Sequence, residues 1–351
     1  MIRIWRQCGD FILKANQTRE EWDLPAVSAT RRERPIAAAS AAPFRKRFKK
    51  QLAFQLFVLL GVAFMIVFNY APMFGILMAF KEYSIASGVS GIFTSEWAGL
   101  RYFREFVSDY NFPTLIRNTL ALSVLKLVFS FPVPILFAIM LNEARHAFFK
   151  RFVQTVSYLP HFISWVVVTG VLFAFFSTDT GLVNNLLADL GLLGEPLQIL
   201  TDPDYFWGLA VVSAVWKEAG WWAIIFLASI ASIDPSLYEA AEMDGAGRLQ
   251  RIWHVTLPGI KGAAVVVLIL SIGNILGGGL VGSNFEQSFL LGNPLNSDKS
   301  QIVQTYAFNT GLAQGRFAFA AAIDLVQSVI SVFLILTSNY VARKLSGTGL
   351  Y

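Results

Sequence analysis

A long uncharged run near the beginning of the chain limits what this sequence can fold into. Residues 52–80, LAFQLFVLLGVAFMIVFNYAPMFGILMAF, contain no charged side chain. As a continuous helix this segment would be about 43 Å long, whereas the hydrocarbon layer of a bilayer is roughly 30 Å thick. We therefore predict a membrane-spanning helix that tilts, bends at Pro72, or projects beyond the lipid.

Five further apolar segments of suitable length follow the first one. The predicted spans cover residues 52–80, 114–141, 152–176, 206–231, 260–282 and 317–342. Only 15% of all residues are charged, compared with about 25% in average soluble domains. These features predict an all-α, polytopic membrane protein. Its six-helix domain, 52–342, lies between an N-terminal extension, 1–51, and a short tail, 343–351.

The distribution of Lys and Arg predicts the orientation of these spans. Twelve basic residues precede the first span, whereas the 177–205 loop contains five acidic residues and no Lys or Arg. Cytoplasmic loops carry an excess of basic residues, so both termini and the 233–259 loop are predicted to be cytoplasmic. The net charge of +5 follows from this topology, and we predict no nucleic-acid partner.

The N-terminal extension has two parts. Residues 1–15 place Ile4, Trp5 and Cys8 on one helical face, with basic residues elsewhere, which predicts an amphipathic helix. This helix is expected to lie on the inner leaflet, and the alternatives are a helix packed on a partner subunit or a frayed terminus. Residues 25–43, rich in Pro, Ala and Ser, are typical of a flexible linker.

The residue types that usually support catalysis or cofactor binding are scarce. Cys8 is the only cysteine, which excludes an internal disulfide and a cysteine-based metal site, and the three histidines lie far apart in the sequence. The sequence contains no GxxxxGK[ST] loop that would bind nucleotide phosphates. We predict no metal or cofactor on this chain, and energy for any transport must come from another chain or an ion gradient.

The cytoplasmic loop at 233–259 carries the clearest local signals. Asp234 is a good N-cap and Pro235 a good first helical residue, so a helix is predicted over 236–243. Gly245 and Gly247 permit a sharp turn, and a second short helix, 249–255, leads into Leu257-Pro258. Two rigid short helices between two spans can transmit force to those spans.

This loop resembles the EAA motif of permease subunits of ATP-driven (ABC) importers. The matching residues are Glu239, Ala240, Ala241, Asp244, Gly245, Leu257 and Pro258, together with Val255, where the family favours Ile. In that family the loop is a coupling helix that docks on a separate ATPase. The resemblance implies a charged contact by Glu239, close approach at Ala240 and Ala241, a turn at Gly245, and anchoring by Leu257-Pro258.

Further segments look like one branch of that family, the type I carbohydrate importers with polysaccharide-type permeases. They include 69–73, 157–164 and 216–218, and the resemblance runs from about residue 55 to the end. It implies an importer of oligosaccharides, including uronate-containing ones such as alginate, in a bacterial inner (cytoplasmic) membrane. The implied partners are a second homologous permease, two ATPase subunits that hold ATP and Mg, and an extracytoplasmic solute-binding protein. The chain itself would form half of a heterodimeric pore and catalyse no reaction.

Few charged residues lie well inside the predicted spans, namely Lys126, Lys217, Glu218 and Asp324, with Arg117 nearer the end of its span. Such residues usually face a bundle interior or a water-filled path. Trp216, Lys217, Glu218 and Trp221 therefore form either a sugar-lined cavity or structural contacts between helices. Lys217 and Glu218 are adjacent, so we expect them to point in different directions rather than to form a self-contained pair. Lys126 and Lys217 favour an acidic substrate.

In the fifth span, Ser271 and Asn274 precede a run of glycines, 277–279, that would let the helix unwind or a neighbouring backbone approach. Asn274 resembles a sugar-contacting position of maltose-type permeases, and the alternative is an amide bonded between helices. His161 is interpreted as a helix-packing or interfacial residue rather than a proton relay.

Two other classes of protein compete with the importer interpretation. An ion-coupled secondary sugar transporter would need an intramembrane carboxylate relay. A membrane enzyme such as a lipid-linked transferase would need clustered Asp, Glu or His at one interface. The sequence shows neither pattern.

Overall fold

The computed structural model of this protein describes residues 52–192, 194–277 and 279–346. The predicted surface helix at 1–15, the linker at 25–43 and Cys8 lie outside the described residues. The chain divides into two compact units, residues 1–66 and 67–351. In the first unit the described residues form helix α3 (Leu52–Met65), which lies within the apolar run that predicts the first span.

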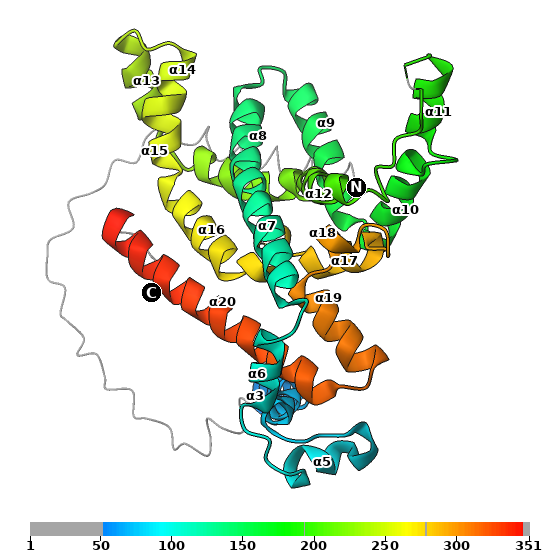
Figure 1. Ribbon diagram of the computed structural model, residues 1–351. Coiled ribbons are helices and arrows are strands. Elements are labelled where there is room, and N and C mark those ends of the chain that lie inside the picture. Colours follow the sequence, from blue (N-terminus) through cyan, green and yellow to red (C-terminus); the bar gives the residue numbers. More distant parts are fainter. Residues whose placement is uncertain (1–51, 193, 278, 347–351) are drawn as a thin grey trace, which may run out of the picture. The chain divides into compact units, whose positions relative to one another are not determined.

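The second unit is helical as well (Figure 1). After the π-helical turn η1 (Ile66–Tyr70), its first half contains α4 (Ala71–Met73), η2 (Phe74–Phe80), η3 (Ile85–Ser87), α5 (Gly88–Thr94), α6 (Arg101–Val107), α7 (Phe112–Ser130), α8 (Pro132–Glu143), α9 (Ala147–Tyr158), η4 (Leu159–Phe162), α10 (Trp165–Phe176) and α11 (Leu182–Asp189). Its second half contains α12 (Pro203–Ala231), α13 (Pro235–Met243), α14 (Arg248–Arg251), η5 (Ile252–Thr256), α15 (Leu257–Gly259), α16 (Lys261–Gly273), η6 (Ile275–Gly277), η7 (Gly279–Val281), α17 (Asn284–Leu291), α18 (Ser297–Ser300), α19 (Val303–Phe308), η8 (Asn309–Ala313) and α20 (Phe317–Ser346). The predicted all-α class is confirmed.

Four helices are long and apolar enough to cross a membrane. They are Phe54–Phe80, Phe112–Glu143, Pro203–Ala231 and Phe317–Lys344, and they correspond to the first, second, fourth and sixth predicted spans. The third and fifth predicted spans are broken helices, bent by 103° and 61°. If each bent pair is one span, the described residues contain six, so the predicted count of six stays a prediction.

The sequence did not predict a bend within 152–176, whereas it did predict that the glycines of 260–282 would let the helix unwind. The third segment bends at Ile163–Ser164, where Ser164 begins α10 as an N-cap whose hydroxyl accepts a hydrogen bond from the Val167 amide (3.4 Å). In the fifth segment the 61° bend lies at Ile260, between Arg248–Gly259 and Lys261–Gly273. Further along the chain the α-helix ends at Gly273, and only short turns follow. Glycine-rich sequence weakens helix continuation at this point, because glycine loses the most backbone entropy on becoming helical.

Helix α12 organises the core of the second unit. One apolar cluster joins it to α8 and α16 through Ala138, Phe226, Ile230, Ile260 and Val267. A second cluster, Leu122, Phe206, Ala210, Leu291 and Ile302, joins it to α7 and to the segment after α16. At Gly220 an added Cβ would lie 2.1 Å from the carbonyl oxygen of Ser157. Only glycine therefore permits the close approach of α12 and α9.

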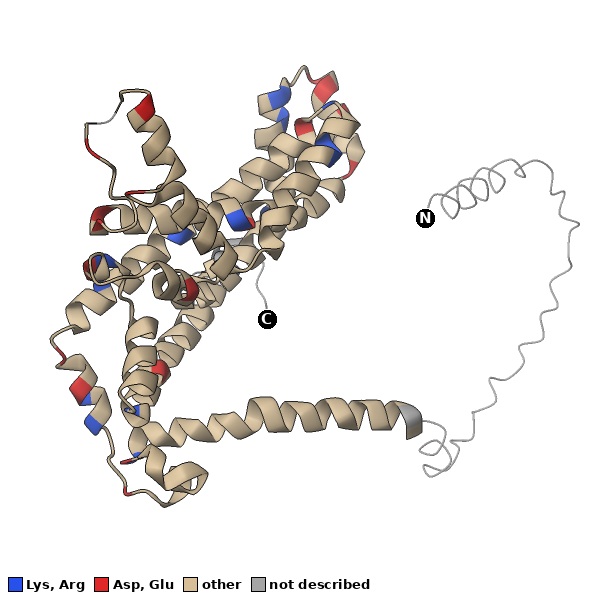
Figure 2. Cartoon of the chain, turned by 90° about the vertical axis from the view of Figure 1, so that its right-hand side faces the viewer, with Lys and Arg blue, Asp and Glu red and all other residues tan. Residues whose placement is uncertain are grey.

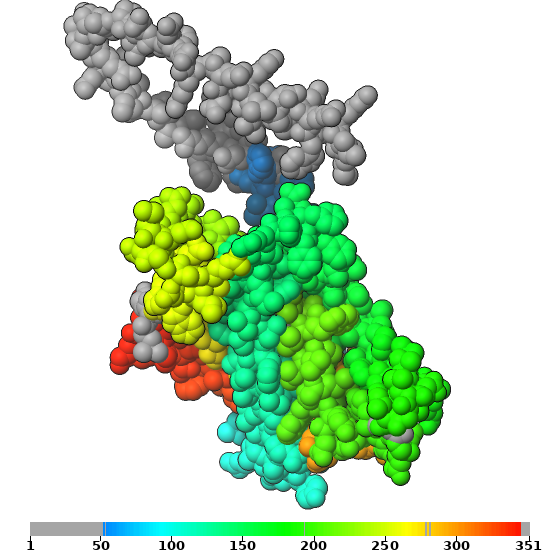
Figure 3. All heavy atoms as spheres, turned by 90° about the horizontal axis from the view of Figure 1, so that it is seen from above, coloured from blue at the N-terminus to red at the C-terminus, as the bar shows by residue number. Residues whose placement is uncertain are grey.

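The segment with α13 and α14 lies at one end of the second unit, away from α5 and α6 at the other (Figure 1). Figure 2 shows a group of charged residues at one upper projection of the molecule, and other charged residues are scattered over the remaining helices and loops. Figure 3 shows the molecule from above, and the α13–α14 region (yellow-green) stands out there as a projection. The fold thus leaves these two short helices projecting from the second unit.

Candidate functional site

The projecting segment 233–259 begins with a well-formed helix cap. The Asp234 carboxylate accepts a hydrogen bond from the Ser236 amide (2.9 Å), and Pro235 occupies the first helical position of α13. The hydrogen bonds from Ser236 lower the pKa of the Asp234 carboxyl below its ordinary value of 3.8. After α13 the chain turns at Gly245, whose φ of +79° favours glycine. The predicted helix, turn and second helix are present.

Three contacts hold the two helical parts of this segment together. Glu242 and Arg251 form an ion pair (3.1 Å) between α13 and α14. The hydroxyls of Tyr238 and Thr256 are hydrogen bonded at 3.0 Å. The two ends of the segment also meet, because a Cβ on Gly259 would lie 2.4 Å from Cδ1 of Ile233. The segment is therefore braced along its length and closed at its base.

The residues that match the EAA motif are distributed over this braced segment. Glu239, Ala240, Asp244, Gly245 and Pro258 are exposed, whereas Ala241 and Leu257 are half-buried. Leu257 packs against the apolar cluster of α8, α12 and α16, as do Ile233 and Ile252. This placement joins the exposed motif to the core of the spans.

Sequence reasoning missed an apolar surface beside the motif. Met243, Leu249 and Trp253 have exposed fractions of 88%, 81% and 69%. Large side chains of this kind, grouped on a polar projection, are typical of protein–protein contact surfaces. Their position in a loop otherwise rich in charges was the available signal.

The candidate substrate-pathway residues on α12 correct one expectation. Lys217 and Glu218 do form a pair, with Nζ of Lys217 2.8 Å from Oε1 of Glu218, and both are buried. Lys217 also donates to the backbone carbonyl of His161 (2.8 Å), and Nδ1 of His161 lies 2.7 Å from Oε2 of Glu218. Both side chains therefore contact His161 as a common partner, although they start from adjacent positions of the helix.

This cluster lies at the break in the third segment. His161 belongs to η4, just before the bend, and its ring stacks on Trp221 at 4.3 Å with an interplanar angle of 1°. The Lys217 ammonium lies 5.6 Å from the ring centroid of Trp165, at the start of α10. A carbonyl released at a helix break needs a donor. The α12 cluster therefore braces the bend, which fits the packing interpretation of His161, while Trp216 is exposed and apart from these contacts.

The candidate residues of the fifth segment differ in accessibility. Ser271 is fully buried, and its hydroxyl donates to the Val267 carbonyl (2.7 Å) in the same helix. Asn274 is exposed and caps the unwound turn, donating through its side chain to the Gly279 carbonyl (3.3 Å). At Gly273 an added Cβ would lie 2.1 Å from Ile335 on α20. The glycines thus allow both the unwinding and the close approach that the sequence suggested.

Helix α7 carries a buried polar stripe that sequence reasoning missed. Its members recur at helical spacing, and they are Asn118, Thr119, Ser123, Lys126 and Ser130. The first three make interhelical hydrogen bonds, for example from the Asn118 side chain to the Asp298 carbonyl (2.8 Å). Lys126 is 0% exposed, and its ammonium has no hydrogen-bond partner among the described residues. Lys126 is therefore an intramembrane lysine without a hydrogen bond or ion pair among the described residues, although Glu286 on α17 attracts it electrostatically.

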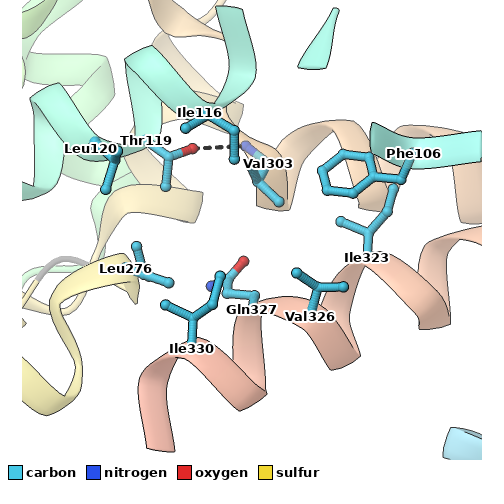
Figure 4. Close-up of a pocket in the computed structure, with 10 residues that line it drawn as sticks. All are labelled: Phe106, Ile116, Thr119, Leu120, Leu276, Val303, Ile323, Val326, Gln327 and Ile330. Atoms are coloured by element: carbon cyan, nitrogen blue, oxygen red, sulfur yellow. Dashed lines mark hydrogen bonds between the residues drawn. The ribbon is translucent and has the colours of Figure 1, made fainter. Parts of the chain in front are cut away.

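An apolar hollow of about 280 Å³ lies between α7 and α20 (Figure 4). Figure 4 shows the Thr119 hydroxyl turned toward Val303, whose amide donates to it at 3.0 Å. Apart from Thr119 and Gln327 the lining is hydrocarbon, so this hollow does not suit a hydroxyl-rich solute. The described residues contain no group of three or more His, Cys, Asp or Glu able to hold a metal ion.

Comparison with known proteins places this chain in a family. Residues 130–347 match the family described as the binding-protein-dependent transport system inner membrane component. The protein LplB of Bacillus subtilis is 41% identical over 322 residues, covering 92% of this chain and 98% of that protein. The polygalacturonan/rhamnogalacturonan transport system permease protein YteP of Bacillus subtilis is also 41% identical, over 91% of this chain and 99% of that protein.

A solved structure supports the same assignment. It is a bacterial ABC transporter involved in the import of the acidic polysaccharide alginate. One of its chains is 36% identical with a TM-score of 0.77, over 86% of this chain and 99% of that chain. A second structure shows that type of transporter with an alginate pentasaccharide-bound periplasmic protein. The chain is thus an integral membrane permease of the ABC type, and it belongs to the binding-protein-dependent transport system inner membrane component family. The predicted resemblance is confirmed.

Proposed function

We propose that this chain is one permease subunit of an ATP-driven importer of acidic oligosaccharides. It would form half of a pore with a second homologous permease, receive saccharide from an extracytoplasmic binding protein, and be driven by two ATPase subunits. The observation that carries the proposal is the braced segment 233–259. It exposes the EAA motif and joins the core of the spans at both ends.

The coupling step follows from the mechanics of that segment. Glu239 offers a charge, and Met243, Leu249 and Trp253 offer apolar area, to a groove on the ATPase. Because Ile233 and Gly259 are in contact at the base, the segment moves as one body. Its anchors Ile233, Ile252 and Leu257 pack against α8, α12 and α16. Displacement by the ATPase would therefore tilt those helices and switch the pore from outward to inward facing.

The acidic class of substrate is supported by two relatives and one lysine. YteP is named for polygalacturonan and rhamnogalacturonan, and the solved neighbour is involved in the import of alginate. Both descriptions thus refer to acidic polysaccharides. Of the two intramembrane lysines, Lys217 is neutralised by Glu218, whereas Lys126 is not paired within the described residues. From its buried position Lys126 would thus contribute a positive potential, partly offset by Glu286, that favours a carboxylate-bearing chain.

The first test is recovery of the partners from the native membrane in mild detergent, followed by mass spectrometry. We expect an ATPase and a second permease. Recovery of this chain alone, also after cross-linking in intact membranes, would contradict the proposal and favour an ion-coupled transporter.

The second test is Glu239→Lys, which reverses the exposed charge of the motif. We expect loss of saccharide-stimulated ATP hydrolysis while the protein remains folded. Glu195→Lys, another exposed glutamate far from this segment in the sequence, is the matched control and should retain it. Equal activity of the two variants would argue against coupling through Glu239.

A further inference from the structure

A second hollow involves another set of residues on α20, namely Phe317, Ala320 and Asp324, and has a different lining. It measures about 340 Å³ and is formed by α17, α19, η8 and the first turns of α20. Its larger side chains are Phe285, Gln304, Phe308, Phe317 and Asp324. Neither the coupling segment nor the cluster around Lys217 includes any of them.

Asp324 gives this hollow a polar lining. The residue lies inside Phe317–Lys344, a segment apolar enough to cross a membrane, yet its side chain is exposed. Within the described ranges no cation lies close enough to form an ion pair with it. A carboxylate in such a helix faces a water-filled space or another protein rather than lipid.

Gln304 provides a second acceptor in the same hollow. Its Oε1 is buried and has no hydrogen-bond partner among the described residues. Leaving a buried amide oxygen without a donor is unfavourable, so the site gains stability when a donor enters. Asp324 and Gln304 thus present two acceptors to one space.

Aromatic rings form the remaining wall. Phe285 and Phe308 contact each other edge to face at an interplanar angle of 61°, with centroids 5.3 Å apart, and Phe308 is 38% exposed. Phe289 completes the group at 5.1 Å from Phe308. These contacts fix the Phe308 ring, which leaves part of it available to an apolar surface from solution. A rigid aromatic surface beside polar acceptors binds amphipathic molecules well.

We propose that this hollow is a saccharide-binding position in the outer part of the permease. The C–H face of a pyranose ring would lie on Phe308, and its hydroxyls would donate to Gln304 and Asp324. Asp324 attracts hydroxyl donors and repels carboxylates, so a uronate unit bound here directs its carboxylate away from α20. The proposal rests on the proposed function and adds a specific position for the solute.

The direct test is photocrosslinking in the complete importer reconstituted in nanodiscs. A benzoylphenylalanine is placed at position 308, and the probe is a fluorescent trigalacturonate or alginate trisaccharide. We expect labelling of this chain that excess unlabelled trisaccharide prevents. The matched control is the same amino acid at position 333, also a phenylalanine, on α20 and 64% exposed, where no protectable labelling is expected. Equal labelling at both positions, or none at 308, would overturn the proposal.

Substitution tests the chemistry of the position. Gln304→Leu removes one acceptor at nearly constant volume and is expected to raise the half-saturating saccharide concentration for uptake about tenfold. Asp324→Asn keeps the size but removes the charge, and it is expected to reduce discrimination against saccharides with an additional carboxylate. Unchanged values in both variants would contradict the proposal.

Two further outcomes distinguish failure of the saccharide position from failure of the proposed importer function. If the unmodified importer transports no oligosaccharide, the proposed function fails, while labelling at 308 still reports whether the hollow binds the probe. If Asp324→Asn prevents recovery of the second permease, the hollow is a subunit contact and the saccharide position is wrong.

Discussion

At the scale of single residues, the buried Lys217–Glu218 pair determines how the break in the third segment is held. Removing one member of a buried pair leaves an unpaired charge, which typically costs about 3–5 kcal/mol, whereas replacing both by apolar residues is often nearly neutral. We expect Glu218→Leu alone to lower the thermal unfolding midpoint in detergent more than Lys217→Met combined with Glu218→Leu. If the two single substitutions instead have additive costs, the pair does not act as a unit.

Gly220 is a second residue whose role depends on a backbone contact. An added Cβ would lie 2.1 Å from the Ser157 carbonyl oxygen, so Gly220→Ala must separate α12 from α9, and overpacking of this kind costs about 1–3 kcal/mol. Gly208 on the same helix meets no atom within 4 Å. Gly208→Ala is therefore the matched control, and we expect it to be neutral or stabilising by up to about 1 kcal/mol. Comparable unfolding midpoints for both variants would argue against the close helix contact.

At the scale of elements, α13 depends on its N-cap, and the cap depends on pH. The folded pKa of Asp234 is lowered, so its contribution to stability is present above the ordinary value of 3.8 and is lost as pH falls through the lower folded pKa. We expect the amides of Ser236 and Leu237 to lose hydrogen-exchange protection in that acidic range. Asp234→Asn, which keeps a neutral cap, should abolish this pH dependence, and Asp234→Ala should lower protection at every pH. The same acid-induced loss in Asp234→Asn would assign it to another group.

The helices themselves could largely be predicted from sequence, because long apolar runs and cap residues act locally. The four unbroken spans and the two helices around Gly245 follow from such signals. The sharp bend at Ile163 could not be predicted in this way. It is held by Lys217 and Glu218, far away in the sequence, and its chemistry exists only once α12 packs against η4.

The candidate site shows the same division. The motif residues Glu239 and Gly245 were found because their spacing is local. The Lys217–Glu218 contact was expected to be absent because adjacent helix positions diverge, but long side chains can still converge on a third group. The unpaired state of Lys126 was not visible in the sequence either, since it depends on which atoms of other helices reach its ammonium.

At the scale of the whole molecule, the segment 233–259 has a function only if it lies on the ATPase side of the membrane. The predicted orientation of this segment relative to the membrane rests on the charge distribution alone. It can be measured with labels at the two ends of the span Phe112–Glu143. Tyr110 precedes this span and is 95% exposed, while His146 follows it and is also exposed. A cysteine at either position is therefore accessible to a labelling reagent from its own side of the membrane.

In a Cys8→Ser background, we expect a membrane-impermeant maleimide to label Tyr110→Cys in intact spheroplasts and His146→Cys only after permeabilisation. The physical reason is that basic residues in short loops next to membrane spans favour the cytoplasmic side, and the 142–151 turn contains Arg145, Lys150 and Arg151. The native Cys8, tested with no other substitution, should behave like position 146. Labelling in denaturant confirms that each cysteine is present and reactive. If position 146 were labelled in intact spheroplasts and position 110 were protected, the chain would have the opposite orientation, and the segment 233–259 could not reach a cytoplasmic ATPase.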